Sequence, residues 1–286
     1  MSISTIQSKV TLNKNFINER FRKYRQEEIS SSKGLRRWMH HLDQLVSKDE
    51  QEFLDNPLVP MDIRISLVEG LSRLNNRSGY HRAFIKELSN LMKRSCGDQP
   101  LEPIKVLDIG AGGGGLLKAI HHWSKRRKIP VELSGADLSQ EFIEATLTRL
   151  TDEKIPVKMF KADACQLETI KDEAYDFVIS SYMVHHIRTP GEVASFFSEV
   201  ARVARKGWLI VDFDRRLYGS AFVKISASIF GTPRVLINDG VKSVRRAYTA
   251  REINFILKEM TTTTGIHDMR CAPHPLFPFW IVKSSF

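Results

Sequence analysis

Five glycines fill six consecutive positions, Gly110 to Gly115, directly after the apolar run IKVLDIG at 104–110. Glycine permits a tight turn and lets a ligand approach the backbone closely, and a run this dense costs backbone entropy on folding. The residues that follow, LLKAIHHWSKRR, have helical character. The sequence therefore predicts a strand, a ligand-approaching turn and a helix, the context in which Gly-x-Gly-x-x-Gly binds a nucleotide-type cofactor.

Apolar runs alternate with helical segments through the rest of the central region. Further strands are expected at 131–139, 156–164, 175–183 and 207–214, and helices from Gln140 and over 191–204. Two final strands are expected in GIHDMRCAPH and PFWIVKSS near the end of the sequence. Strands that alternate with helices are typical of βαβ units with right-handed crossovers, so we expect an α/β fold with a doubly wound sheet.

The flanks depart from this alternation. Residues 1–100 are expected to form a helical N-terminal extension or cap, and residues 101–286 the main domain. In the extension, helices are predicted over 33–54, from Asp62 and from Tyr80. Residues 216–247 interrupt the main domain and are expected to form a lid over an acceptor site. After the lid, Thr249 and Glu252 have the spacing of a capping box that starts a helix.

Composition excludes several classes of protein. The chain has 286 residues, 42% hydrophobic and 27% charged, which is ordinary for a soluble globular protein. No apolar run approaches 18 residues and no signal peptide is visible, so we expect neither integral membrane association nor secretion. The three widely spaced cysteines suit a reducing cytoplasm. The net charge of +10 comes from scattered residues that fit a solvated surface as well as an anionic partner.

Carboxylates at the strand ends discriminate between two cofactors. Asp108 stands two residues before the first glycine and would repel the pyrophosphate of a dinucleotide, whereas it favours the ammonium and sulfonium of S-adenosylmethionine. Asp137, after the second strand, is placed to accept hydrogen bonds from ribose hydroxyls, and Asp163, after the third, from an adenine amino group. The carboxyl ends of parallel strands share one crevice, so this set predicts S-adenosylmethionine.

The segments VLDIGAGGGG, GADLS, KADACQL and YDFVISSYMVHHI together resemble the motif series of class I S-adenosylmethionine-dependent methyltransferases. The resemblance covers about residues 101–215 and implies a Rossmann-like, seven-stranded sheet whose last strand is antiparallel. It also implies the cofactor contacts: Asp108, Gly110, Ala111, Gly112 and Gly114 at the methionine end, Asp137 and Leu138 at the ribose, Asp163 and Ala164 at the adenine, and Ser180 and Ser181 beside the cofactor.

The helical N-terminus and the segment VRRAYTAREI at 244–253 more faintly resemble bacterial methyltransferases that act on lipids, polyketides or quinones. That likeness predicts O-methylation of a phenolic, carboxylic or lipid-like hydroxyl on an aromatic or lipid-like small molecule. C-methylation of a quinone-type ring and methylation of RNA stay open as alternatives. A D/N-P-P-Y signature and a loop cysteine are absent, which disfavours nucleic acid, and the intact glycine loop disfavours a non-catalytic binding protein. The extension suits either a lid or a homodimer surface.

His185, just after the fourth strand, is the candidate general base, because imidazole accepts protons near neutral pH. In the related cyclopropane-type and quinone-type enzymes a Glu often stands at this position, and a purely structural role for His185 is an equal alternative. Adjacent side chains are expected to point apart, so His185 and His186 predict no metal site.

Candidate acceptor contacts are Tyr182, Arg245, Arg246 and Tyr248, with the apolar lid residues Leu217, Phe222, Ile225, Ile229 and Phe230. Tyr80, Asn76 and Arg77 are candidates to close the cofactor pocket.

Overall fold

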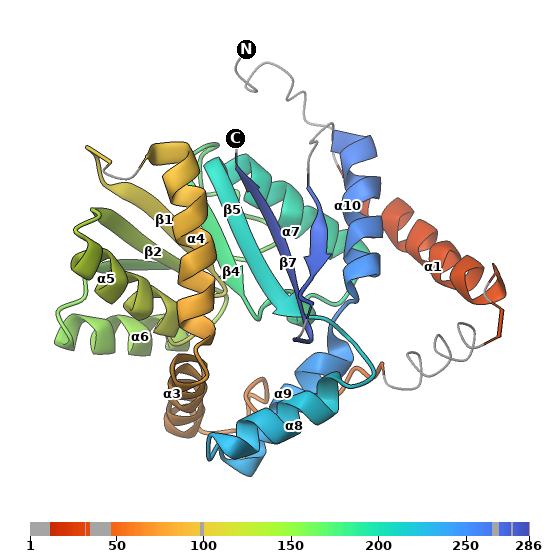
Figure 1. Ribbon diagram of the computed structural model, residues 1–286, viewed down its shortest axis with the longest axis horizontal. Coiled ribbons are helices and arrows are strands. Elements are labelled where there is room, and N and C mark those ends of the chain that lie inside the picture. The colour runs from red at the N-terminus through yellow and green to blue at the C-terminus, as the bar shows by residue number, and fades with distance from the viewer. Residues whose placement is uncertain are drawn as a thin grey trace.

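The computed structural model describes residues 12–31, 33–34, 47–97, 100–264, 269–275 and 277–285. Its seven-stranded sheet has the order β3-β2-β1-β4-β5-β7-β6 (Figure 1). The strands are β1 (Ile104–Ile109), β2 (Val131–Asp137), β3 (Val157–Lys161), β4 (Tyr175–Ser181), β5 (Ala204–Phe213), β6 (Cys271–Pro273) and β7 (Phe279–Ser285). Strands β1 to β5 run parallel, and β7 pairs antiparallel with both β5 and β6, which confirms the doubly wound sheet with its antiparallel final strand.

Helices cover both faces of the sheet. They are α1 (Lys14–Ser31), α3 (Met61–Arg77), α4 (Tyr80–Cys96), α5 (Gly115–Arg127), α6 (Gln140–Asp152), α7 (Pro190–Val203), α8 (Gly219–Ile229), α9 (Arg234–Arg246) and α10 (Ala250–Thr264), with a 3-10 turn, η2 (Val184–His186). One apolar core joins the sheet to α4 and α5, and a second joins it to α1, α7 and α10. No helix in the described part of the chain has both the length and the apolar character needed to cross a bilayer.

Local sequence explains where several of these helices begin. The N-terminus of α7 has a capping box between Thr189 and Glu192, with Pro190 in the first helical position. The same arrangement occurs before α10, where the Thr249 N–H donates to Glu252 at 2.8 Å and the Glu252 N–H donates to the Thr249 hydroxyl at 3.2 Å. These contacts confirm the capping box expected from the sequence at that position.

The N-terminal extension packs directly on the main domain. Ile17 and Phe21 of α1 are buried in the core shared with α7 and α10, while Phe84 and Leu88 of α4 pack on the opposite face of the sheet. The helix expected over 33–54 falls largely on 35–46, outside the described residues, and its described parts, 33–34 and 47–54, are not helical.

Residues 216–247, where the sequence predicts a lid, contain the helices α8 and α9, and we refer to this segment as the lid. Helices α8 and α9 lie together beyond the end of the sheet toward which β5 points (Figure 1). The segment 47–60 runs along α9 and is fastened to it by Asp239, whose carboxylate accepts the backbone N–H groups of Phe53 and Leu54 at 2.8 and 3.1 Å. The extension therefore reaches the edge of the sheet where the crevice lies.

Candidate active site

One large cavity opens at the carboxyl ends of the parallel strands. Its volume is about 1510 Å³, above the ~300–1,000 Å³ typical of a pocket for one small molecule. Its walls come from the glycine loop, the ends of β1 to β5, helices α3 and α4, the segment 47–60 and the lid. A cavity of this size has room for a nucleoside cofactor together with a second molecule.

Glycines allow the loop between β1 and α5 to pack closely on its neighbours. Gly110 has φ +73°, and a Cβ there would collide with the side chain of Met183. Gly114 has φ +64°, but a Cβ on it would meet Thr146 and Leu150 of α6. The lack of a side chain at Gly114 therefore lets the loop pack closely against α6. Gly114 does not line the cavity, although the sequence predicted that it contacts the cofactor.

Three carboxylates lie on the cofactor side of the cavity, as the strand order requires. Asp137 accepts hydrogen bonds from the backbone N–H groups of Gly112 at 2.8 Å and Ser139 at 3.0 Å, so it also holds the glycine loop. Asp163 accepts the N–H of Cys165 at 2.8 Å. Both residues line the cavity together with Asp108.

Asp108 has the most unusual environment of the three. Its side chain is buried, and no described residue donates a hydrogen bond to its carboxyl group. Burial, with the nearby charge of Asp137, raises the pKa of Asp108 to about 8. A buried carboxyl without a donor is suited to a cationic ligand group, and an ammonium supplies both charge and hydrogen bonds. This environment fits the methionine end of S-adenosylmethionine.

Most residues predicted to contact the cofactor are brought together on the cavity wall: Asp108, Gly110, Ala111, Gly112, Asp137, Leu138, Asp163, Ala164 and Ser181. Ser180 is not among them, because its hydroxyl is buried and donates to the Ile109 carbonyl at 2.7 Å. Ser181 pairs with the Tyr80 hydroxyl at 2.7 Å, which places Tyr80 at the cavity. Asn76 and Arg77 do not line it.

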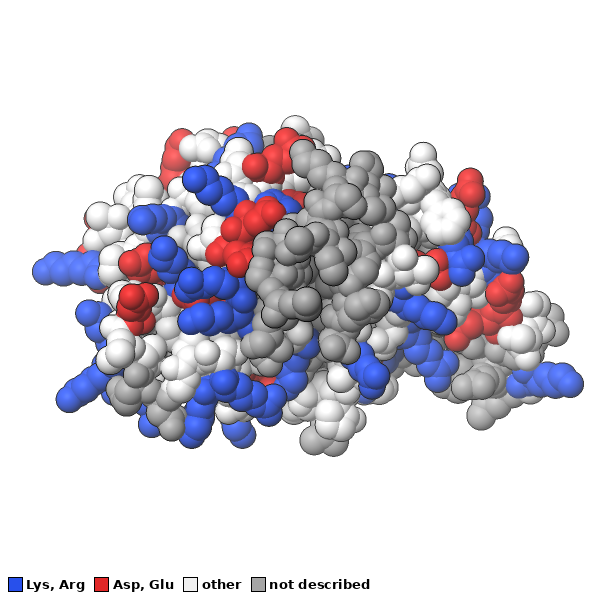
Figure 2. Space-filling model, turned by 90° about the horizontal axis from the view of Figure 1, so that it is seen from above, with Lys and Arg blue, Asp and Glu red and all other residues white. Residues whose placement is uncertain are grey.

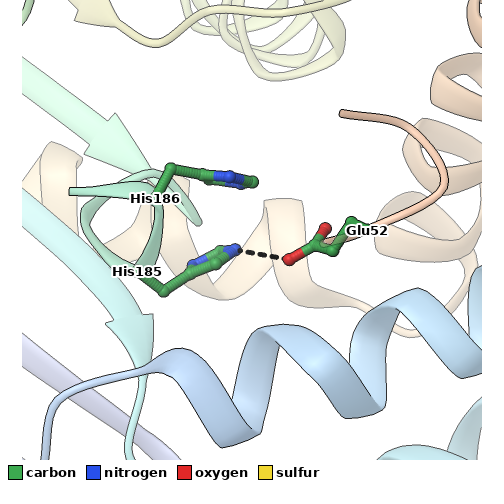
Figure 3. A group of neighbouring side chains, drawn as sticks. All are labelled: Glu52, His185 and His186. Atoms are coloured by element: carbon green, nitrogen blue, oxygen red, sulfur yellow. Dashed lines mark ion pairs between the residues drawn. The ribbon is translucent and has the colours of Figure 1, made fainter. Parts of the chain in front are cut away.

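His185 lies between two carboxylates in the deep wall of the cavity. Its Nδ1 is 2.7 Å from Asp212 of β5, which also accepts the His185 backbone N–H at 2.9 Å. Its Nε2 points to Glu52 of the segment 47–60, at 3.6 Å (Figure 3). Burial of the imidazole opposes protonation, but Asp212 and Glu52 outweigh burial and raise the pKa of His185 to about 10. The imidazole is thus an imidazolium at neutral pH in this arrangement.

The ring of His186 lies beside that of His185, tilted by 38°, and does not point away from it. The ring centroids are 4.2 Å apart because the 3-10 turn η2 brings both side chains to the same side (Figure 3). The expectation that the adjacent rings point apart is therefore wrong. The Nδ1 of His186 lies 3.1 Å from Asp55, and Arg246 binds the same carboxylate at 3.1 Å. Glu52, Asp55 and Asp212 were not identified from the sequence.

The aromatic wall next to this group is built around Tyr182. Tyr182 has φ +55°, a left-handed conformation that is uncommon for a residue with a side chain. Its ring stacks between Tyr80 and Phe213, with centroid distances of 4.5 and 4.7 Å. Backbone strain of this kind is often found at functional sites.

The other predicted acceptor residues lie elsewhere. Tyr248 is buried in the core with its hydroxyl 3.4 Å from the carbonyls of Ile187 and Arg188. Arg246 is engaged by carboxylates of the segment 47–60, and Arg245 pairs with Glu50 at 3.7 Å, so neither lines the cavity. Both arginines thus form ion pairs with the segment 47–60, which the sequence did not predict to lie beside α9.

The glycine loop, the strand-end carboxylates and the seven-stranded sheet resemble those of class I S-adenosylmethionine-dependent methyltransferases. A sequence profile described as "Methyltransferase domain" matches residues 107–211, so this part of the chain is a methyltransferase domain, and the cofactor of its class is S-adenosylmethionine. The chain is 27% identical over 149 residues to the ubiquinone biosynthesis O-methyltransferase of Caulobacter sp. (strain K31), which covers 51% of this chain and 56% of that protein. The chain thus spans about half the length of the curated relatives it matches.

A second relative has the same name as the first, and two solved structures share the fold. The ubiquinone biosynthesis O-methyltransferase of Rhizobium rhizogenes (strain K84) is 30% identical over 112 residues, 39% of this chain and 41% of that protein. The plantazolicin methyltransferase BpumL, solved with SAH, shares the fold across 94% of this chain and 99% of its own, with a TM-score of 0.56 and 15% identity. A putative methyltransferase from Methanococcus maripaludis covers 83% and 96%, with a TM-score of 0.51 and 14% identity.

Proposed function

We propose that this protein transfers the methyl group of S-adenosylmethionine to an oxygen of an apolar small molecule. The observation that carries the proposal is the single cavity that joins the cofactor crevice to a chamber under the lid, with His185 in its wall. In this proposal, Asp108, Asp137 and Asp163 hold the methionine, ribose and adenine parts of the cofactor, and the acceptor occupies the chamber.

The lining of the chamber supports an apolar acceptor. The lid residues that line it are the apolar Phe222, Val223, Ala227, Phe230 and Leu236, together with Gly240 and the polar residues Ser226, Asp239 and Ser243. Of the apolar lid residues predicted to contact the acceptor, Phe222 and Phe230 line the cavity, whereas Leu217, Ile225 and Ile229 are exposed and do not line it. The stacked rings of Tyr80, Tyr182 and Phe213 favour a flat acceptor such as a phenol or quinol. The Caulobacter and Rhizobium relatives are named ubiquinone biosynthesis O-methyltransferases, which also supports a phenol or quinol acceptor.

S-adenosylmethionine supplies a methyl group already activated by its sulfonium. The protein therefore has to align the acceptor oxygen in line with the sulfur, exclude water and allow the hydroxyl to lose its proton. His185 is the side chain we place next to that hydroxyl, because Nε2 is the ring nitrogen that Asp212 leaves available. An imidazolium paired with Glu52 cannot accept a proton, so the activation of the hydroxyl requires the proton on His185 to be displaced.

The test is a product assay with purified full-length protein. A panel of phenols, a hydroquinone, hydroxylated fatty acids and total RNA is incubated with methyl-labelled S-adenosylmethionine, and products are identified by mass spectrometry. Label in an O-methyl ether or ester of a small molecule supports the proposal. Label on a ring carbon would make the protein a C-methyltransferase, and label in RNA would overturn the small-molecule assignment. On the face seen in Figure 2, Lys and Arg are dispersed and interrupted by Asp and Glu, which disfavours the RNA outcome.

A further inference from the structure

Three potential metal ligands meet in the wall of the cavity. Glu52, His185 and His186 each place one ligand atom within 4.8 Å of the other two. The histidines come from the turn after β4 and the glutamate from the segment 47–60, more than 130 residues away, as Figure 3 shows. Glu52 and His185 are buried, His186 is half-buried, and all three line the cavity.

The second observation concerns the other nitrogen of each ring. Nδ1 of His185 is 2.7 Å from Asp212, and Nδ1 of His186 is 3.1 Å from Asp55. Histidines that bind metal ions almost always donate their other N–H to a carboxylate or carbonyl, which fixes the tautomer and increases the basicity of the ligating nitrogen. A carboxylate at Nδ1 of both rings leaves Nε2 as the ligating atom of each. The carboxylate of Glu52 is itself oriented by the Ser243 hydroxyl, which donates to it at 2.8 Å.

The charges around the group are unbalanced in the direction that a cation corrects. Glu52, Asp55 and Asp212 supply three negative charges. Arg246 lies 3.5 Å from Glu52 and 3.1 Å from Asp55 and supplies one positive charge. The imidazolium of His185 supplies a second positive charge only while it keeps its proton. A ligating imidazole must be neutral, so a metal ion that displaces this proton meets two negative charges. One divalent cation balances them.

We propose that Glu52, Nε2 of His185 and Nε2 of His186 bind one divalent first-row metal ion, with its remaining coordination positions facing the acceptor chamber. Two imidazoles and one carboxylate form a ligand set suited to Zn²⁺, Mn²⁺ or Fe²⁺, whereas Mg²⁺ and Ca²⁺ prefer oxygen ligands. Three protein ligands with open positions are typical of a catalytic metal site, whereas a structural site is closed by four.

The ion also accounts for the activation that the proposed function requires, and this part of the inference rests on that function. A metal ion that displaces the proton between His185 and Glu52 lowers the pKa of a hydroxyl that binds it. The acceptor then loses its proton to solvent when it binds, and the oxyanion attacks the methyl group. The new O–CH₃ bond forms as the S–CH₃ bond breaks, which leaves S-adenosylhomocysteine.

The binding test uses full-length protein that has been stripped with a chelator and dialysed. Zn²⁺ is titrated by calorimetry, Co²⁺ by its visible absorption, and bound metal is counted by elemental analysis. We expect one equivalent of Zn²⁺ and a Co²⁺ spectrum typical of mixed nitrogen and oxygen ligands. Glu52→Gln and His186→Gln are each expected to weaken binding at least tenfold, and Asp212→Asn about 10–100-fold through its effect on His185.

The chain provides a matched control in another adjacent histidine pair, His121 and His122 of α5. Their ring centroids are 5.7 Å apart, and the charged groups that act on His121 are His122 and Lys125, both basic. His122→Gln should leave metal binding unchanged. No binding of either metal, or equal binding by wild type, Glu52→Gln and His186→Gln, would overturn the inference. Calorimetry with S-adenosylhomocysteine on the same samples separates this failure from failure of the proposed function.

Discussion

Arg25 of α1 and Glu252 of α10 are joined by a hydrogen bond of 2.7 Å across 227 positions of sequence. The same carboxylate binds the buried guanidinium of Arg215 at 3.0 Å and caps the first turn of α10 through Thr249. Glu252 therefore connects the N-terminal extension, the strand β5 that precedes Arg215, and the helix that follows the lid.

Glu252→Gln should destabilise the protein by about 3–5 kcal/mol, because it removes a buried carboxylate that binds the guanidinium groups of both Arg215 and Arg25. Burial opposes ionisation of Glu252, but Arg215 and Arg25 outweigh it and lower its pKa. The stabilisation is accordingly present above the unfolded-state pKa of about 4.3 and is lost as the pH falls through the lower folded value. Urea unfolding at several pH values measures both effects. Glu27→Gln, which breaks an exposed ion pair with Lys23, should change stability by less than about 0.5 kcal/mol.

Asp137→Ala should weaken the binding of S-adenosylhomocysteine by about 2–4 kcal/mol. The variant removes the carboxylate that we place at the ribose, and it frees the Gly112 N–H that orders the glycine loop. Calorimetry measures the loss, with Asp152→Ala at the exposed end of α6 as the control. An affinity equal to that of wild type would mean that the ribose lies elsewhere.

Asp108→Asn should raise stability and lower cofactor affinity together. The folded pKa of about 8 lies above the unfolded value of about 3.9, so Asp108 costs stability increasingly as the pH rises between these values. At pH 8 the Asn variant should melt a few degrees higher than wild type. An ammonium binds the ionised carboxyl, so wild-type affinity for S-adenosylhomocysteine should rise from pH 6 to pH 8, and the variant should lose that slope. Calorimetry at both pH values checks this, and a slope that persists in Asp108→Asn would assign it to another group.

His185→Gln should reduce methyl transfer by at least about 10²-fold, because it removes a ligand of the proposed metal ion beside the acceptor hydroxyl, and it should leave the affinity for S-adenosylhomocysteine within about two- to three-fold. The reason is that His185 lies on the acceptor side of the cavity and the strand-end carboxylates on the other. Turnover of the best acceptor found in the product assay is the readout, with His122→Gln as the matched control. Unchanged turnover would remove His185 from the chemistry.

The cofactor half of the site was predictable because it is local. Its location follows from one strand, the five glycines after it, and one carboxylate at the end of each of the next two strands. These features predict one crevice because the carboxyl ends of parallel strands lie at the same edge of the sheet. The helices of the extension from Asp62 and Tyr80 were predictable from periodicity in the same way.

The acceptor half could not be predicted, because its contacts join distant segments. Nothing near Glu52 in the sequence indicates that it faces His185. The sequence also predicted that Glu52 lies in a helix over 33–54, whereas residues 47–54 are not helical. Arg246 and Tyr248 were assigned to the acceptor without knowledge that the segment 47–60 and the core would engage them. Asp212 did carry a signal, since an acidic residue inside the apolar strand GWLIVDFD needs a buried partner.

The two halves of the cavity differ in how their residues are distributed along the sequence. The cofactor wall is one nearly continuous stretch that coincides with the profile match at 107–211, whereas the acceptor wall is assembled from the segment 47–60, the turn η2 and the lid. Similarity confined to the continuous stretch therefore groups proteins by the molecule that donates the methyl group, not by the one that receives it. A chimaera that exchanges the segment 47–60 and the lid with those of a relative should acquire the relative's acceptor while it keeps its own affinity for the donor.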